Sequence, residues 1–551
     1  MATPDQRQVF IIGGGLAGMA VAHELAKQAV PVTILEAGNR LGGKAGADYD
    51  PDLDIWLDHG FHIFPAWYAN VRPLLEDLGI AGELVDTDTQ HTITRGASDG
   101  ERGRWLTNYA VTSVRRALHN LFNTPLPWHQ AAIGSYFLID LASKWFGRRG
   151  FLDRVSVNGY FRSRWYCNEA VANFHHFLGL QASSIPADAM SAATFQTVVR
   201  GFMQHREVLV GMLRGDLQTH FIQPFQQRLA ELGVRILFNH PIRRLQVGAG
   251  RVVALHAGAQ PRLGMSLQDA DTGATAAGER QLLEIEGQGL FADDMFVLAT
   301  PPERTRQFLD DDIYSIDRDG LDEHRALSGL NYLTSEPMAA LHVVFKRRLP
   351  HIPPWHTSMH HSRYGLSMID ISQHWPELQA RNQTVLSAIA ADFKGIQGLT
   401  PQRQADLILE DLLSFIRNDA SGRKVIDDDD IAAVRLNPNV SAPLFLNTTS
   451  AWHYRPDGRT QIANLFVCGD YCRSQADLTS MESAVYSGMR TAQHILRALG
   501  KDWRAAEPKR FATPPRVLLL ALKYLLMPAI APIGLAYLLQ RKIAPRPAAE
   551  Y

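Results

Sequence analysis

The stretch VFIIGGGLAGMAVAHELAKQAVPVTILEAGNRLGGKAG, residues 9–46, decides the fold of this chain. Its four apolar residues at 9–12 are typical of a buried parallel strand. Gly13, Gly15 and Gly18 follow with the G-x-G-x-x-G spacing. In that pattern the first glycine forms a tight turn, the second lets a pyrophosphate approach the backbone, and the third lets a helix pack closely on the strand.

The segments after the glycines complete the pattern. A helix over 16–28 would direct its N-terminal N–H groups and the positive end of its dipole at the phosphate. A second apolar strand, 32–35, ends at Glu36, about 20 positions beyond the glycines, where a carboxylate can accept hydrogen bonds from a ribose. Because strand, turn, helix, strand and acid arrive in order, the stretch predicts a dinucleotide-binding unit rather than an ordinary glycine-rich turn.

A second glycine pair follows the acid within the sequence RLGGK at 40–44. Together with the first motif, this pair resembles the flavoprotein superfamily of amine oxidases and carotenoid desaturases. The resemblance implies FAD as the cofactor, with Glu36 as the acidic residue. It also implies that Arg40, Gly42 and Gly43 lie near the diphosphate and the flavin side.

The segment 54–64, DIWLDHGFHIF, resembles the corresponding stretch of plant and cyanobacterial phytoene and zeta-carotene desaturases. The resemblance implies that this segment lies beside the flavin, and Gly60 would permit a close approach of the backbone. The alternative is that His59 and His62 only cap a turn and pack against their neighbours.

Two later segments, 464–471 and 478–488, form a strand, a turn and the start of a helix that resemble the C-terminal desaturase signature. The resemblance implies cofactor contacts from Gly469 and Asp470, the latter at the ribityl or phosphate portion, and places Met481 at the isoalloxazine edge. It also implies that Ile242 contacts the adenine through its backbone, in a region where the chain returns to the nucleotide-binding unit.

No paired carboxylates and no Ser-His-Asp pattern mark a catalytic centre in this sequence. Our catalytic candidates are therefore two residues that the resemblance puts on the flavin side, His62 and Glu482. The histidines at 356, 360 and 361 lack a regular metal-binding spacing, so we predict no metal.

The bulk composition excludes some classes of protein. A length of 551 residues predicts two or more domains, and a net charge of −1, from 55 basic and 56 acidic side chains, gives no indication of nucleic-acid binding. Cys167, Cys468 and Cys472 suit a reducing compartment, and we interpret the last two as structural, with a redox pair as the alternative. No apolar signal segment precedes the first strand.

We predict an α/β protein with a Rossmann-type FAD-binding domain of the glutathione-reductase-like kind, a mixed-sheet substrate domain and a helical, membrane-facing subdomain. The FAD-binding domain is assigned to residues 1–100, 231–310 and 456–500. The remaining segments are a helical substrate or membrane-facing region (101–230), a substrate-domain sheet (311–455) and an apolar membrane-associating tail (501–551).

Within these regions we expect helices over 109–122 and 131–146, which either lie at a membrane interface or are internal to a substrate domain. Strand 232–238 should continue into an edge meander over 241–245 and 251–255. Residues 258–289 should form a loop with one strand. Further strands are expected over 293–300, 338–345, 365–370 and 385–391, and a helix over 401–417.

The tail at 517–539 is apolar and long enough to span a bilayer. Because Lys523, Pro528 and Pro532 interrupt it, and basic residues flank it, monotopic insertion is favoured over a straight span. The alternative is a helix packed on the body of the protein. We therefore expect a cytoplasmic protein that is peripheral on the membrane surface.

These inferences predict an FAD-dependent oxidoreductase that desaturates a lipophilic isoprenoid or carotenoid by hydride transfer to flavin, inside an apolar tunnel. Residues 452–456, WHYRP, depart from the desaturase pattern, so the substrate stays open. The alternatives are a hydroxysqualene dehydroxylase, an amine oxidase, or a redox-neutral isomerase or membrane-bound binding protein that only holds flavin. A quinone and oxygen are both open as electron acceptor.

Overall fold

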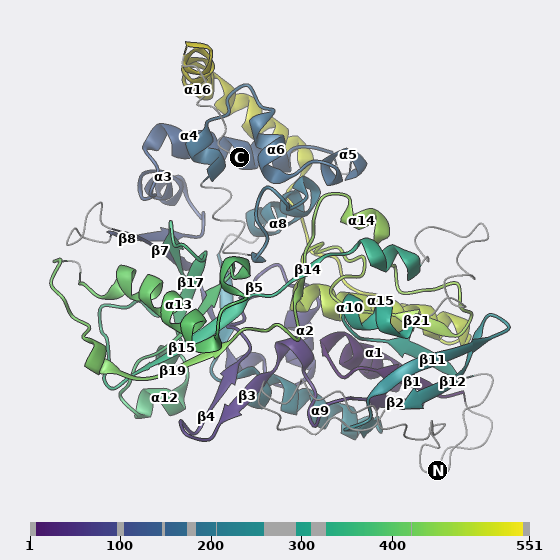
Figure 1. The fold of residues 1–551 in the computed structure, drawn as a ribbon. Coiled ribbons are helices and arrows are strands. Elements are labelled where there is room, and N and C mark those ends of the chain that lie inside the picture. Colours follow the sequence, from purple (N-terminus) through teal and green to yellow (C-terminus); the bar gives the residue numbers. More distant parts are fainter. Residues whose placement is uncertain are drawn as a thin grey trace.

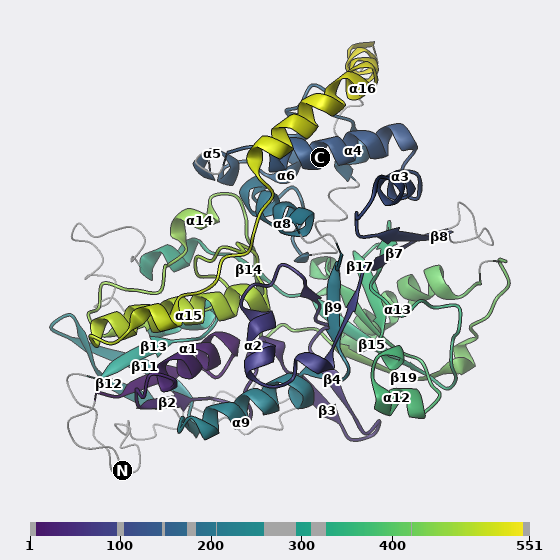
Figure 2. The same cartoon turned by 180° about the vertical axis from the view of Figure 1, so that it is seen from behind.

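The computed structural model describes residues 7–95, 104–145, 149–173, 183–204, 207–257, 294–309, 327–419 and 421–543. Two sheets lie side by side in the lower half of the molecule, with a group of helices above them (Figure 1). The long C-terminal helix runs along this group (Figure 2). The loop and strand expected over 258–289 fall outside the described residues.

The first sheet has five parallel strands in the order β10-β2-β1-β13-β21. They are β1 (Val9–Ile12), β2 (Val32–Leu35), β10 (Arg235–Leu237), β13 (Met295–Leu298) and β21 (Leu465–Val467). The strands predicted over 9–12 and 32–35 are confirmed. The strands come from three distant parts of the chain, 9–35, 235–298 and 465–467. Parallel strands cannot be joined by a tight hairpin and need long crossover connections, which leaves room for other segments between them.

Three helices cover one side of this sheet: α1 (Leu16–Ala26), α9 (Gln223–Glu231) and α15 (Met481–Ala498). Helices α1 and α15 lie against each other, and a Cβ at Gly488 would come within 2.5 Å of the carbonyl oxygen of Ala17. Only a glycine permits that approach. Helix α1 ends two residues earlier than the predicted end at 28, a normal error for a helix boundary.

The expected edge meander is wrong in one respect. Strands β11 (Ile242–Gly248) and β12 (Arg251–Ala257) form an antiparallel sheet of their own.

Several short helices and strands lie outside the two large sheets. They are α2 (Val71–Asp77), β3 (Ala47–Asp50), β4 (Ile55–Asp58), β5 (Phe64–Pro65), β6 (Leu84–Thr87), β9 (Val210–Leu213), α10 (Pro302–Thr305), β14 (Ser335–Glu336), α12 (Pro376–Ala380), β20 (Leu444–Phe445) and α14 (Ala451–Tyr454).

The second sheet has seven strands in the order β19-β15-β18-β17-β16-β7-β8 and is mixed, because β16 and β7 pair in parallel. Its strands are β7 (Thr89–Thr94), β8 (Arg104–Tyr109), β15 (Ala339–Phe345), β16 (Thr357–His360), β17 (Leu366–Asp370), β18 (Val385–Ala390) and β19 (Ile431–Asn437). Helix α13 (Pro401–Ile416) packs on one face.

The placement of β7 and β8 corrects two predictions. The sequence assigns 89–94 to the FAD-binding part and 101–230 to a helical region, whereas both strands form one edge of the second sheet. The helix expected from 109 begins only at Val114, because Tyr109 still pairs with Thr89 across the strands. Strand pairing with distant residues overrides the local helical spacing here.

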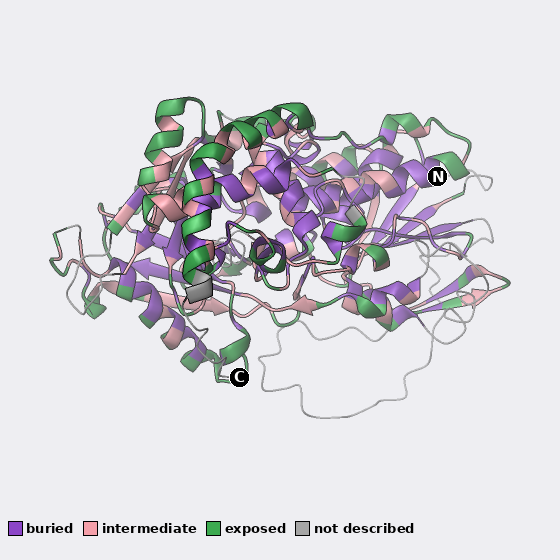
Figure 3. Cartoon of the chain, turned by 90° about the horizontal axis from the view of Figure 1, so that it is seen from above, coloured by how far each residue is buried: buried purple, intermediate pink, exposed green. Residues whose placement is uncertain are grey.

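The helices above the sheets are α3 (Val114–Phe122), α4 (Trp128–Ala142), α5 (Arg149–Asp153), α6 (Val157–Arg162), α8 (Ala192–Gln204) and α16 (Arg516–Ile543). Helix α16 packs against α4, and Leu519 and Ile530 are buried in that contact region. The helix continues through Pro528 and Pro532, so the tail is not broken at these prolines. Its outer side is exposed (Figure 3).

Candidate functional site

A cavity of about 2120 Å³ connects both sheets with the helices above them. It begins at the loop between β1 and α1, passes beside the start of α15, and continues among α3, α4, α8 and α16. Within the described residues its charged lining side chains are Glu36, Lys44, Arg243, Arg304 and Asp470. All five come from segments that flank the five-stranded sheet, so the cavity has a charged end and an apolar end.

The three glycines of the G-x-G-x-x-G motif differ in what a side chain at each position would meet. Gly13 has a φ of +107°, and a Cβ there would come within 2.6 Å of the Ala299 carbonyl oxygen. A Cβ at Gly18 would come within 2.2 Å of the Gly13 carbonyl oxygen, so this glycine lets α1 pack on the turn. A Cβ at Gly15 would meet nothing within 4 Å, which leaves its cavity-lining backbone open to a ligand.

Glu36 lies at the end of β2 and lines the same end of the cavity. One carboxylate oxygen accepts the backbone N–H of Gly14 and the other accepts that of Gly38, each at 2.7 Å. These bonds fix the orientation of the carboxylate. Since a carboxylate has about four acceptor sites, each oxygen can still accept a ribose hydroxyl.

The second glycine pair folds back onto the first loop. The Gly42 N–H donates to the Gly14 carbonyl oxygen at 2.9 Å, and both Gly42 and Gly43 have positive φ values, +116° and +58°. Both glycines line the cavity, and so does Lys44. The Lys44 ammonium is buried and has no hydrogen-bond partner in the described part of the chain. A buried, unpaired cation beside an open glycine loop indicates an anionic group such as a diphosphate.

Arg40 does not take the role that the resemblance implies. Its guanidinium pairs with Asp48 and lies over the ring of Trp56, 5.7 Å from the centroid, and the residue does not line the cavity. The resemblance therefore selects a basic residue that does not border the cavity. Lys44, directly after the second glycine, is the residue that faces the cavity.

The other predicted cofactor residues border the same space from the far part of the chain. Ile242, Gly469, Asp470 and Met481 all line the cavity. Gly469 and Asp470 follow β21, and the Gly469 N–H is held by the hydroxyl of Ser487 at 3.0 Å. Met481 is the first residue of α15, so the cavity also meets a helix N-terminus.

Glu482 has a structural role that sequence reasoning missed. Its carboxylate is buried, accepts the side-chain N–H of Asn70 at 2.6 Å and the backbone N–H of Val71 at 3.0 Å, and does not line the cavity. Burial raises the pKa of this carboxyl, although the hydrogen bonds oppose that shift. The structure therefore corrects its assignment as a catalytic candidate: Glu482 joins the start of α15 to the start of α2.

His62 lines the cavity, and its Nδ1 has no hydrogen-bond partner among the described residues. Burial lowers the pKa of the ring to about 4, so the imidazole is neutral near pH 7. Gly60 is buried but does not line the cavity; a Cβ there would lie 3.2 Å from the Met338 side chain. Gly60 thus lets the segment pack on the second sheet, and its neighbours Phe61 and His62 reach the cavity.

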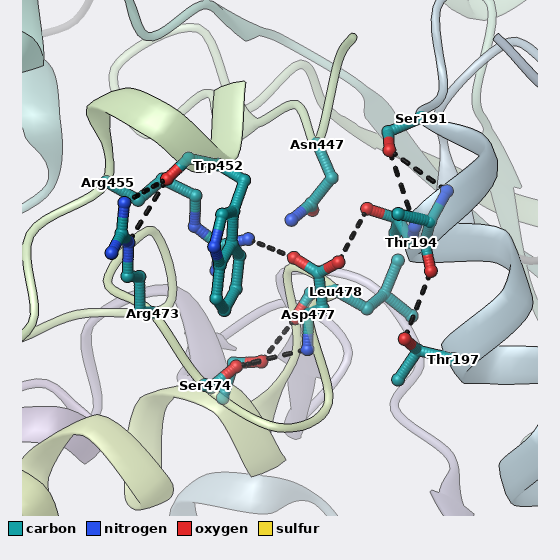
Figure 4. A network of polar contacts seen from close by, with 12 residues as sticks. Ser191, Thr194, Thr197, Asn447, Trp452, Arg455, Arg473, Ser474, Asp477 and Leu478 are labelled. Atoms are coloured by element: carbon teal, nitrogen blue, oxygen red, sulfur yellow. Dashed lines mark hydrogen bonds and ion pairs between the residues drawn. The ribbon is translucent and has the colours of Figure 1, made fainter. Parts of the chain in front are cut away.

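A buried polar network holds the loop that carries Gly469 and Asp470 (Figure 4). Arg455 forms an ion pair with Asp477 and donates to the Tyr471 carbonyl oxygen at 2.7 Å. The other Asp477 oxygen accepts the hydroxyl of Thr194 in α8 at 3.0 Å. The network therefore fixes the loop between β21 and α15 and ties it to α8, a wall of the apolar end of the cavity.

The remaining polar candidates do not form a site. Cys468 and Cys472 are buried and form no disulfide, and burial raises the pKa of both thiols, which opposes a reactive thiolate. The described residues contain no cluster of three or more side chains suited to a metal ion.

The chemistry of the charged end of the cavity fits FAD. The backbone at Gly15 is open to a ligand, the Glu36 carboxylate can accept a ribose hydroxyl, and the Lys44 ammonium is buried without a hydrogen-bond partner among the described residues. The sequence profile of the family "Flavin containing amine oxidoreductase" matches residues 16–496. The chain belongs to this family. It is an FAD-dependent oxidoreductase, and it is related to the carotenoid desaturases.

The 15-cis-phytoene desaturase of Synechococcus elongatus is 24% identical to this flavoprotein over 495 residues, which cover 89% of this chain and 96% of the relative. The zeta-carotene desaturase of Synechocystis sp. is 27% identical over 263 residues, 45% of this chain and 53% of the relative.

Two solved structures share the fold of this flavoprotein. Wild-type putrescine oxidase bound to putrescine has a TM-score of 0.62 at 17% identity and covers 89% of this chain and 99% of its own. Cyclohexylamine oxidase from Brevibacterium oxydans has a TM-score of 0.60 at 14% identity and covers 90% and 100%.

Proposed function

We propose that this flavoprotein desaturates a lipophilic isoprenoid of the carotenoid type. The Gly13–Gly18 loop, Glu36, Lys44 and the Gly469–Asp470 turn would hold FAD, which accepts a hydride from a bound substrate. The protein would contribute orientation and exclusion of water. His62 is neutral and weakly basic, which suits a reaction that needs little acid–base assistance from the protein.

The observation that carries this proposal is the apolar end of the cavity. In the described residues, this end has no charged lining side chain. It is lined by α3 (Ala117, Leu118, Leu121), α4 (Ala131, Leu138, Ile139), α8 (Phe195, Val198, Phe202) and α16 (Leu522, Leu526, Ile530, Ile533). A long polyene has no group that needs a charged partner, and a channel of this kind can bury most of its surface.

We also propose that the helices α3 and α16, which line the apolar end of the cavity, contact a lipid surface. Large apolar side chains gather on α3 and α16, where Val114, Val517 and Leu525 are 77%, 78% and 76% exposed. By length and composition, residues 516–540 could cross a membrane. Because one side of α16 packs on α4, we favour peripheral contact through its outer side.

The test is anaerobic reduction of the bound flavin. Purified protein with FAD is mixed in liposomes with phytoene-type carotenes, squalene derivatives or amines, and bleaching of the oxidised flavin band is followed. Bleaching by polyenes supports the proposal. Bleaching by amines alone would assign the protein to amine oxidation, and the absence of bleaching with FAD still bound would favour a redox-neutral role.

A further inference from the structure

Three polar side chains form a row across the edge of the seven-stranded sheet. Gln90 of β7 lies opposite Asn108 of β8, and the register of β16 with β7 places His356 next to Gln90 on the other side. All three residues line the cavity. Neighbouring strands lie about 4.8 Å apart, so this polar row extends over roughly 10 Å.

The alternation of the strands explains why the row faces the cavity. His91, next to Gln90, bonds with its Nδ1 to the Thr107 hydroxyl at 3.1 Å, and Ile93 packs in the core beneath α13. Side chains of the opposite parity therefore face the cavity. They include Thr92 and its cross-strand neighbour Ser358, which also line it.

The row contains a buried acceptor that the protein leaves unused. The Asn108 Oδ1 atom is buried and has no hydrogen-bond partner in the described part of the structure. Native proteins satisfy most buried polar atoms, so an unsatisfied one in a cavity wall calls for a partner from a ligand or a water molecule. A pure hydrocarbon would cover this oxygen without bonding to it.

The row is also uncharged. The charged lining residues of the cavity belong to the nucleotide end, and none of them lies on the seven-stranded sheet. Burial lowers the pKa of His356 to about 4, so its ring is neutral near pH 7. The part of the cavity wall formed by the seven-stranded sheet therefore offers no carboxylate to pair with an ammonium ion and no cation to pair with a phosphate, within the described residues. The chemistry of the row matches a neutral donor or acceptor.

We propose that the polar row binds a neutral oxygen-bearing group, a hydroxyl or a carbonyl, on an otherwise apolar isoprenoid substrate. This inference rests on the proposed function and narrows it from any lipophilic isoprenoid to an oxygenated one. Gln90 and Asn108 carry both amide donors and amide acceptors, so they can pair with a hydroxyl in either direction. The apolar end of the cavity would hold the rest of the isoprenoid substrate.

The experiment compares matched ligands on the FAD-loaded protein. The pairs are squalene with 1-hydroxysqualene, and phytoene with its 1-hydroxy-1,2-dihydro derivative. Binding is measured in liposomes by the perturbation of the flavin absorption band and, separately, by quenching of tryptophan fluorescence. Anaerobic flavin reduction is recorded on the same samples. We expect about tenfold tighter binding of the hydroxylated ligand in each pair.

Two variants locate the effect. Asn108→Leu combined with Gln90→Leu should remove most of the preference for the hydroxylated ligand and leave hydrocarbon binding within about twofold. Thr107→Val is the matched control, because Thr107 is next to Asn108 on the same strand but bonds to His91 on the other face. It should keep the preference.

The outcomes separate this inference from the proposed function. Equal binding of hydrocarbon and hydroxylated ligand by the wild-type protein overturns the inference, whether or not either ligand reduces the flavin. A hydroxyl preference that depends on Asn108 and Gln90, without flavin reduction by either ligand, supports the polar row and overturns the desaturase function. Failure of both isoprenoid pairs to bind overturns both.

Discussion

Thr194 and Asp477 are 283 residues apart in the chain, and a hydrogen bond of 3.0 Å joins the hydroxyl of the first to the carboxylate of the second. Thr194 belongs to α8, which lines the apolar end of the cavity, and Asp477 belongs to the loop that carries Gly469 and Asp470. This bond and the Arg455–Asp477 ion pair join a helix at the apolar end of the cavity to the loop at its charged end (Figure 4).

Replacement of Arg455 tests this junction. Arg455→Met leaves the carboxylate of Asp477 buried without its cation, which costs on the order of 3–5 kcal/mol. We expect a lower melting temperature and earlier release of FAD on heating, followed by flavin fluorescence. Thr194→Val removes only one neutral donor and should lower the stability by about 1–2 kcal/mol. Equal melting of Arg455→Met and wild type would contradict the structural role.

Two glycines of the first loop should respond differently to the same added methyl group. Gly15→Ala places a methyl in open cavity space, so the apoprotein should fold normally and bind FAD at least about tenfold more weakly. Gly18→Ala forces a Cβ to within 2.2 Å of a carbonyl oxygen and should destabilise the fold itself by about 1–3 kcal/mol or more. FAD titration and chemical denaturation of the apoproteins separate the two effects.

Lys44 and Arg40 form a second matched pair. Lys44→Met removes the buried ammonium and should weaken FAD binding by about 1.5–3 kcal/mol, the range for a hydrogen bond to a charged group. Arg40→Met breaks a surface pair with Asp48 and should change FAD affinity little. Isothermal titration of the apoproteins with FAD gives both values. A larger loss in Arg40→Met would restore the role that the motif implies for Arg40.

Acid should destabilise the fold through His342. Its Nε2 donates to the Asp58 carbonyl oxygen at 2.9 Å, and burial lowers its pKa to about 4, below the 6.5 expected in the unfolded chain. The unfolded state therefore binds the proton more readily, so this contribution to stability is present above pH 6.5 and is lost as the pH falls toward 4. At pH 5 the loss is about 2 kcal/mol.

The measurement compares the free energy of unfolding at pH 7.5 and pH 5. His342→Gln keeps a donor for the Asp58 carbonyl group but cannot be protonated, so its difference between the two pH values should be smaller than that of the wild type by about 2 kcal/mol. His453→Gln, at an exposed position, is the control and should reproduce the wild-type difference.

We test the membrane contact by adding charged side chains to α16. Deletion of α16 is unsuitable, because this helix also lines the cavity. Val517→Glu with Leu525→Glu changes two residues of the outer side, each more than three-quarters exposed. We expect at least about tenfold weaker sedimentation with anionic vesicles and an unchanged melting temperature. Glu substitutions at two exposed positions on α13, Gln402 and Arg403, provide the control, and unchanged sedimentation of the α16 variant would contradict the proposal.

The predictions from sequence are accurate where the determinants are local. The 9–46 stretch contains its own strand, turn and helix signals, so the order of its residues is enough to place its glycines and Glu36. Errors arise where distant contacts decide. The carboxylate of Glu482 is occupied by Asn70, 412 residues away, and neither residue's neighbours reveal that pairing.

The edge strands of the second sheet are missed for the same reason. Strand β7 pairs with β16 more than 250 residues later, and no local spacing indicates that partner. Arg40 and Lys44 illustrate a different limit, because a motif specifies which residue types are present but not which side chain turns into the cavity. The segment at 452–456 is unusual in sequence, yet its role depends on the ion pair between Arg455 and Asp477, which no local pattern indicates.

The topology of the first sheet also constrains how the protein is made. The strand β1 ends at residue 12, but β21 ends only at 467, and Gly469 and Asp470, which line the charged end of the cavity, follow it. A ribosome adding about 5–20 residues per second needs tens of seconds between these strands. The first strand therefore waits for its sheet to be completed, and the glycine loop at 13–18 meets Gly469 and Asp470 only after more than 450 further residues have been added.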